Sequence, residues 1–200
     1  MSKYNQVMLS GCVASGFTFS HELYGEKFYT ANIAVQRCSD AVDIIPAMFS
    51  ERLINTTEDY TDAPIQIYGQ FRSYNQHEEN RTKLLLYIFV LDYQWMEDTE
   101  NINKATLEGY ICKKPIYRVT PFGREIADVL LAVNRPYGKS DYIPCIVWGR
   151  NARYVETLEI GSCIRLYGRI QSREYIKTIG DTEERKTAYE LSVSKMETVA

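Results

Sequence analysis

The 200-residue sequence has few of the residues on which most catalytic and metal sites depend. Its two histidines are His21 and His77, and neither has a cysteine or carboxylate neighbour at metal-ligand spacing. We find no glycine-rich phosphate loop and no nucleophile elbow, and we can place no general-base pair. These absences predict that the protein is not an enzyme and that it holds no metal and no other cofactor.

Paired cysteines and long hydrophobic runs are also missing. The five cysteines form an odd set without C-x-x-C spacing, so they are predicted to be reduced, small core residues, as in cytosolic proteins. The longest apolar run, Leu84–Leu91, has eight residues, against about 20 for a membrane span. The N-terminus lacks a charged and then apolar leader. We therefore expect a soluble, intracellular protein without a membrane partner.

What the sequence does contain is an internal repeat. Residues 7–54 match residues 105–152 at a constant offset of 98, and after one insertion the offset becomes 99. Matching residues include Gly11 and Gly109, Gly25 and Gly123, Arg37 and Arg135, Arg52 and Arg150, and Ser73 and Ser172. The repeat predicts two copies of one unit. The predicted domains are residues 1–96 and 104–200, joined by an acidic linker at 97–103.

Both copies alternate apolar and polar residues between Gly, Pro and Asn signals, which is typical of strands. Strands are predicted at 6–12, 28–36, 41–49, 64–72 and 83–94, and at 105–112, 126–134, 142–148, 162–170 and 187–195. Residues 151–161 have helical spacing and end at Gly161. The polar stretch 173–186 is predicted to be an extended hairpin.

Five strands with one helix between the third and fourth is the order of the OB-fold, a small Greek-key barrel. The predicted fold class is therefore all-β. We expect two tandem OB-folds, each a five-stranded Greek-key barrel with one short helix between strands 3 and 4.

Several short motifs follow one another in the second copy: Gly109-Tyr-Ile-Cys, Thr120-Pro-Phe-Gly-Arg-Glu, Leu131-Ala-Val-Asn-Arg-Pro, Asp141-Tyr-Ile-Pro-Cys-Ile-Val-Trp-Gly-Arg and Tyr167-Gly-Arg-Ile-Gln-Ser-Arg-Glu-Tyr175. In this order they resemble the bacterial single-stranded DNA-binding protein family. The first copy resembles it more loosely, through Gly69-Gln-Phe-Arg-Ser-Tyr74 and Ile45-Pro46. The best description is a tandem two-module variant of that family.

The resemblance places the family's base-stacking aromatics at four positions: Tyr137, Tyr142, Trp148 and Tyr175. Period-two alternation puts Trp148 on the outer face of its strand, opposite an apolar face. Cations that could contact phosphates lie in the same turns and strands, at Arg124, Arg135, Arg150, Arg173 and Lys177. Aromatic platforms beside cations are what binding to unpaired DNA requires.

The first copy provides an internal control. The equivalents of the four aromatics are Ser39, Ile44, Ser50 and Gln76, and Phe49 is expected to point into the core. Residues 1–100 carry 7 Lys+Arg against 14 Asp+Glu, whereas residues 101–200 carry 16 against 12. Our hypothesis is that the first module is mainly scaffold or assembly surface. Arg72, Tyr74 and Tyr29 are weaker candidates there.

The expected function is binding of single-stranded DNA largely without sequence preference, protecting it in replication, recombination or repair. The resemblance also implies a homodimer that presents four OB modules, and a bacterial cytoplasmic location with the nucleoid. The family's acidic C-terminal tail is not seen, so recruitment of partners through it is not expected. The alternative is an OB module that binds structured RNA or a primosome protein, because the fold alone does not choose a ligand.

Overall fold

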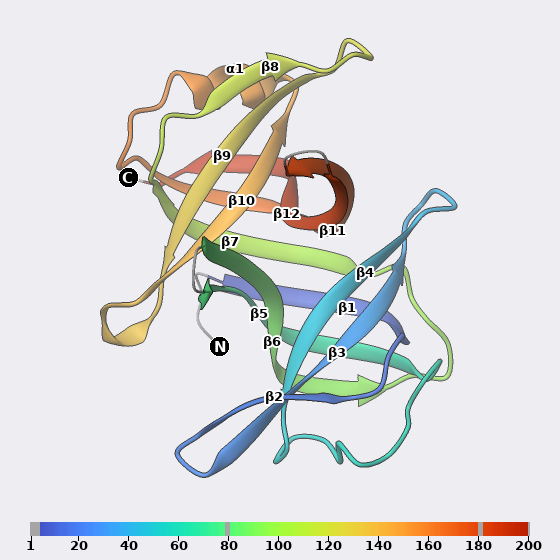
Figure 1. Ribbon diagram of the computed structural model, residues 1–200. Helices are drawn as coiled ribbons and strands as arrows, with labels where there is room; N and C mark the ends of the chain where they lie inside the picture. Colours follow the sequence, from blue (N-terminus) through green and yellow to red (C-terminus); the bar gives the residue numbers. More distant parts are fainter. Residues whose placement is uncertain (1–4, 79–80, 180–181, 200) are drawn as a thin grey trace.

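The computed structural model describes residues 5–78, 81–179 and 182–199 and shows the same order of strands twice (Figure 1). The N-terminal unit, residues 5–95, contains β1 (Asn5–Val13), β2 (Thr18–Leu23), β3 (Glu26–Gln36), β4 (Val42–Ser50), β5 (Pro64–Glu78) and β6 (Arg81–Trp95). The C-terminal unit, residues 103–199, contains β7 (Asn103–Ile111), β8 (Ile116–Val119), β9 (Glu125–Asn134), η1 (Pro136–Gly138), β10 (Ser140–Trp148), α1 (Arg150–Glu156), β11 (Cys163–Ile179) and β12 (Thr182–Thr198).

Each unit closes into a five-stranded barrel. In the N-terminal unit the strand order is β1-β3-β4-β6-β5, and β5 pairs with β1 again. The order β7-β9-β10-β12-β11 repeats it, with β4–β6 and β10–β12 as the parallel pairs. The short strands β2 and β8 add to β3 and β9. The all-β fold with two OB-type barrels is therefore confirmed, with one additional short strand in each barrel.

The helix prediction holds for one unit and is wrong for the other. In the C-terminal unit, α1 begins at Arg150 and buries Ala152 and Val155. Residues 51–63 of the N-terminal unit form turns instead. There the Asn55 side chain accepts a hydrogen bond from the Thr57 backbone N–H (3.2 Å), and the Asp59 side chain accepts one from the Thr61 backbone N–H (2.9 Å). Side chains that bond to nearby backbone in this way compete with helix formation.

The matched glycines of the repeat are explained by close packing of strands. A Cβ atom on Gly109 would lie 2.3 Å from the Ala132 carbonyl oxygen, and one on Gly11 would lie 2.3 Å from that of Ala34. No side chain fits at these distances, so β1 and β7 can cross β3 and β9 only through glycine. The barrels close at these two positions.

The two units join through antiparallel pairing of β1 with β7, which makes one continuous 12-stranded sheet. Val7 pairs with Ala105, its own equivalent at offset 98, and Asn5 and Leu9 pair with Leu107 and Asn103. The joint is therefore pseudo-symmetric about Val7 and Ala105, as in an isologous dimer. The strand β7 begins at Asn103, inside the predicted linker.

A buried ion pair of the C-terminal unit holds the N-terminal unit. Arg135 Nη2 donates to Asp141 Oδ1 (2.7 Å) and to the Ser73 carbonyl oxygen (3.0 Å). The Ser73 backbone N–H donates to the same Asp141 oxygen (2.6 Å). Asp141 is fully buried. Ser73 lies on β5. These bonds therefore fix the β5–β6 hairpin of the N-terminal unit against the β9–β10 corner of the C-terminal unit.

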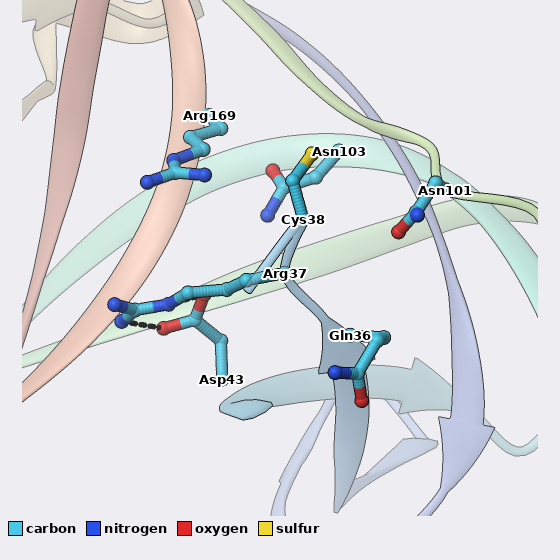
Figure 2. Close-up of a pocket in the computed structure, with 7 residues that line it drawn as sticks. All are labelled: Gln36, Arg37, Cys38, Asp43, Asn101, Asn103 and Arg169. Carbon is cyan, nitrogen blue, oxygen red and sulfur yellow. Dashed lines mark hydrogen bonds and ion pairs between the residues drawn. The ribbon is translucent and has the colours of Figure 1, made fainter. Parts of the chain in front are cut away.

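The reverse contact uses the equivalent residues. Arg37 binds both carboxylate oxygens of Asp43, which also accepts hydrogen bonds from the Ser172 backbone N–H (2.7 Å) and hydroxyl (3.0 Å). Figure 2 shows this ion pair in a cleft between the units, with Arg169 of β11 across from it. Burial alone would raise the pKa of Asp43, but the bonds from Arg37 and Ser172 outweigh it and lower that pKa.

The prediction that the cysteines are core residues is correct for only one of the five. Among the described residues all five are free, but Cys145 alone is fully buried; Cys38 is exposed, and the others are half-buried. In the same part of the chain, no helix is long and apolar enough to cross a membrane.

Candidate nucleic-acid interface

The predicted stacking aromatics lie on β10, on the turn before it and on the β11 arm. Tyr142 and Tyr175 are 42% and 38% exposed, and Trp148 is half-buried at the end of β10. The opposite face of β10 is fully buried at Ile143 and Val147, which confirms the predicted alternation. Ile146 is also buried, although it shares the face of Tyr142.

Tyr137 is presented on a strained turn. It is 99% exposed and adopts the left-handed region at φ 65°, between Pro136 and Gly138. The Arg135 backbone N–H donates to the Lys139 carbonyl oxygen (2.7 Å) and closes this turn. A non-glycine residue held at positive φ costs about 1 kcal/mol, and such positions are concentrated at functional sites. The ring is free to meet a ligand.

Trp148 is held in a fixed orientation. Its indole Nε1 donates a hydrogen bond to the Ser192 hydroxyl (3.1 Å) on β12, and its backbone pairs with Ile126 on β9. The N–H donor of the indole is therefore already hydrogen-bonded within the protein. The remaining surface borders a cleft of about 500 Å³, which is also lined by Thr120, Phe122 and Arg124.

Phe122 also lines this cleft, and it was not among the residues predicted from the sequence. It lies in the turn between β8 and β9 and is 92% exposed. Its repeat equivalent is Tyr24, which is 97% exposed and likewise precedes a glycine. The presence of an aromatic residue at this turn in both copies was the available signal.

The predicted cations differ in how far they are already engaged within the protein. Arg124 and Arg150 are exposed, and neither has an ion-pair partner among the residues that the structure describes. Arg173 lies 3.8 Å from Glu190, and its guanidinium carbon is 5.9 Å from the centre of the Tyr175 ring. Arg135 is committed to Asp141 and Ser73. The Lys177 side chain lies outside the described residues.

The N-terminal unit has a different surface at the equivalent positions. Ile44 is 39% exposed, and Ser50 bonds to Glu26, which stands where the C-terminal unit has Arg124. Phe49 is fully buried, as predicted. A carboxylate therefore stands where the C-terminal unit has a cation.

The weaker candidates are mostly engaged with their own unit. Arg72 lies 3.9 Å above the Phe89 ring and donates twice to the Gln70 side-chain oxygen (2.7 and 3.1 Å). Burial and the nearby Arg135 lower the pKa of Arg72. Tyr29 contacts Phe19 edge to face at 5.7 Å, whereas Tyr74 is 57% exposed. Of these three, Tyr74 offers the most free ring surface.

The two histidines do not form a site that the structure can place. His21 is exposed and stacks on Phe28 at 5.0 Å, and the His77 side chain lies outside the described residues. No group of three or more His, Cys, Asp or Glu residues in the described ranges could hold a metal ion.

Comparisons with known proteins find similar sequences and a similar fold. The model of the single-strand binding protein family matches residues 102–199. The chain is 38% identical over 81 residues to the single-stranded DNA-binding protein of Halalkalibacterium halodurans, covering 37% of this chain and 48% of the relative. It is 40% identical over 81 residues to single-stranded DNA-binding protein 1 of Staphylococcus aureus, with the same coverage. The match thus spans about half the length of these curated relatives.

A solved structure extends the likeness to both units. The wild-type single-stranded DNA binding protein from Thermus aquaticus superposes with a TM-score of 0.78 over 98% of this chain and 93% of that chain, at 15% identity. At this identity the superposition concerns the fold, and it includes the tandem arrangement of two barrels. The C-terminal unit, which the family model matches over residues 102–199, is therefore similar to the single-strand binding protein family.

Proposed function

We propose that the C-terminal unit binds single-stranded DNA largely without sequence preference. The observation that carries the proposal is that exposed tyrosine rings lie on the η1 turn, β10 and β11, while Trp148 lines a cleft together with Arg124, which has no ion-pair partner in the described part of the chain. Bases would stack on Tyr137, Tyr142, Trp148 and Tyr175, and phosphates would meet Arg124, Arg150 and Arg173. Each stacked base contributes about 1–3 kcal/mol in such sites.

The N-terminal unit is proposed to serve mainly as scaffold and assembly surface. Its equivalent face carries Glu26 in place of an arginine and lacks the four aromatics. Its contacts to the other unit are extensive, because the carboxylate of Asp43 and the arm carrying Ser73 both lie in the joint. A phosphate chain would be repelled by this unit's net charge.

The biological role that follows is protection of unpaired DNA in replication, recombination or repair, in the bacterial cytoplasm. Two chains are proposed to associate so that four barrels are presented together. The proposal involves no catalysis, since binding by stacking and charge needs no reacting group.

The test is a titration of fluorescein-labelled oligo(dT) with the whole chain at low salt, followed by the fluorescence anisotropy of the label. The Trp148→Ala variant is expected to bind about 5–100-fold more weakly, because one stacking platform is removed. The matched control is Trp95→Phe, which changes the second tryptophan, in the N-terminal unit, and keeps an aromatic ring there.

Three results would contradict the proposal. Oligo(dT) could fail to bind at low ionic strength, or Trp148→Ala could bind as tightly as the parent. A strong preference for a folded RNA of equal length would instead favour an RNA-binding OB module. Association of two chains is measured separately, by sedimentation of the free protein.

A further inference from the structure

The cleft beside Trp148 has two aromatic residues in its lining, and only Trp148 was expected from sequence. Its volume of about 500 Å³ lies within the range of small-ligand pockets, about 300–1,000 Å³. Its lining is mostly apolar, with Phe122 contributed by the β8–β9 turn and Trp148 by the end of β10. The cleft therefore offers a ligand two aromatic side chains and one arginine.

The turn that carries Phe122 is fixed by its own hydrogen bonds. The Gly123 N–H donates to the Thr120 carbonyl oxygen (2.8 Å), and the Arg124 N–H donates to the Thr120 hydroxyl (3.1 Å). Gly123 adopts φ 73°, which only glycine accepts readily. Phe122 is thus presented to solvent by an ordered turn, although exposing a whole phenyl ring is unfavourable.

The charge around the cleft favours an anion at its rim. Arg124 has no ion-pair partner in the described part of the chain. The adjacent carboxylate, Glu125, is held by Arg153 (2.7 Å) and by the Tyr117 hydroxyl (2.5 Å), and these two contacts lower its pKa. Because Glu125 is already paired, the charge of Arg124 remains available to a phosphate.

We propose that this cleft is a slot for a single unpaired nucleobase, which inserts against both Phe122 and Trp148 while Arg124 contacts the adjoining phosphate. The inference rests on the proposed function, which it deepens by assigning one base a two-walled subsite. The aromatic wall at residue 122 distinguishes the slot from simple stacking on an open ring, because it covers the base from a second side.

The N-terminal unit supplies the matched comparison. Tyr24 occupies the same turn and is 97% exposed, but the positions of Trp148 and Arg124 are taken by Ser50 and Glu26. A lone ring beside a carboxylate makes no slot for a base with its phosphate. Tyr24 therefore controls for any general effect of an exposed aromatic residue at this turn.

The experiment uses the whole chain. Titrations of oligo(dT) and of an abasic oligomer of equal length, which has the phosphates without the bases, are followed by the fluorescence anisotropy of a fluorescein label on each oligomer. Phe122→Ala is expected to weaken oligo(dT) binding roughly 5–30-fold and to leave the abasic affinity within about twofold. Phe122→Tyr is expected to retain the parent's affinity, and Tyr24→Ala to change it by less than about twofold.

The outcomes separate the slot from the proposed function. If Phe122→Ala binds oligo(dT) like its parent while Trp148→Ala in the otherwise unaltered chain binds weakly, the slot is wrong and the proposed function stands. An equal loss on the abasic oligomer, or an equal loss from Tyr24→Ala, also overturns the slot. If the parent itself fails to bind oligo(dT) at low salt, both proposals fall. Phe122 is almost fully exposed, so its variants are expected to fold normally.

Discussion

The two barrels of this chain have one topology and two different surfaces. Residues that the strands need for closure, such as Gly11 and Gly109, are kept in both copies. Residues that fix one unit to the other, such as Arg37 and Arg135, are also kept. The rings and charges on the outer face are not: where the C-terminal unit has Trp148 and Arg124, the N-terminal unit has Ser50 and Glu26. The two copies thus share the residues that barrel closure and docking use, and they differ at exposed positions where we propose that DNA binds.

The joint between the units affects how they can be compared. Separated halves would leave the β1 and β7 edges unpaired and remove the serine partners of both buried aspartates. Binding measured on isolated halves would therefore mix loss of folding with loss of a site. The comparison is cleaner with matched variants of the whole chain.

The largest expected effect is on the free energy of unfolding, and it comes from the contacts between the two units. Asp43→Asn is expected to lower the free energy of unfolding by about 3 kcal/mol, because Arg37 loses a buried partner that binds it through both oxygens. Asp141→Asn should cost less, about 2 kcal/mol, since one oxygen of Asp141 has no hydrogen-bond partner in the described structure. Urea denaturation at pH 7 measures both. A larger loss for Asp141→Asn would contradict the contact geometry.

The stabilising contribution of the Asp43 carboxylate is also expected to depend on pH. The folded pKa of Asp43 lies below its usual value of 3.8, so its contribution is present above that pH and is lost as the pH falls through the lowered value. The stability difference between the parent and Asp43→Asn is therefore expected to shrink on acidification from pH 5 to about pH 2. Urea denaturation across this range measures it. The control is Asp40→Asn, at an exposed position, and an equal pH dependence of that variant would refute the assignment.

The difference between the two outer faces can be tested at one pair of positions. Tyr142 and its equivalent Ile44 are similarly exposed, at 42% and 39%. Tyr142→Ala is expected to weaken binding of oligo(dT) by about 1–2 kcal/mol, because a stacking ring is lost. Ile44→Ala should have no measurable effect in the same fluorescence titration. Equal losses would mean that both barrels bind DNA alike.

The smallest expected effect concerns phosphate contacts. Arg150→Ala should weaken binding a few-fold and reduce the slope of log affinity against log salt by about 0.7, the value for one phosphate contact to a single strand. Its equivalent Arg52 lies 3.5 Å from Glu26, so Arg52→Ala should leave the slope unchanged. Titrations at several salt concentrations measure this. A slope change for Arg52→Ala alone would reverse the roles of the two units.

Local pattern predicted much of the fold because each unit's strands alternate regularly and the repeat supplied a second copy for comparison. The core face of β10, the buried Phe49 and the hairpin arm of β11 were all predicted from residues close together in sequence. The helix of the N-terminal unit was predicted wrongly because Asn and Asp side chains compete locally for the backbone. Spacing alone did not reveal that competition.

The sequence by itself determined the barrel, the duplication and the set of rings and cations available for a ligand, since strand periodicity and residue type are local properties. Only the tertiary structure decided which of these rings and cations are not already engaged by other residues of the protein. It placed Arg135 in a buried contact with Asp141 and Ser73, residues 6 and 62 positions away, and it placed Phe122 in the same cleft as Trp148. Burial and the availability of a charge depend on what packs around a side chain, and that is fixed only when distant strands meet.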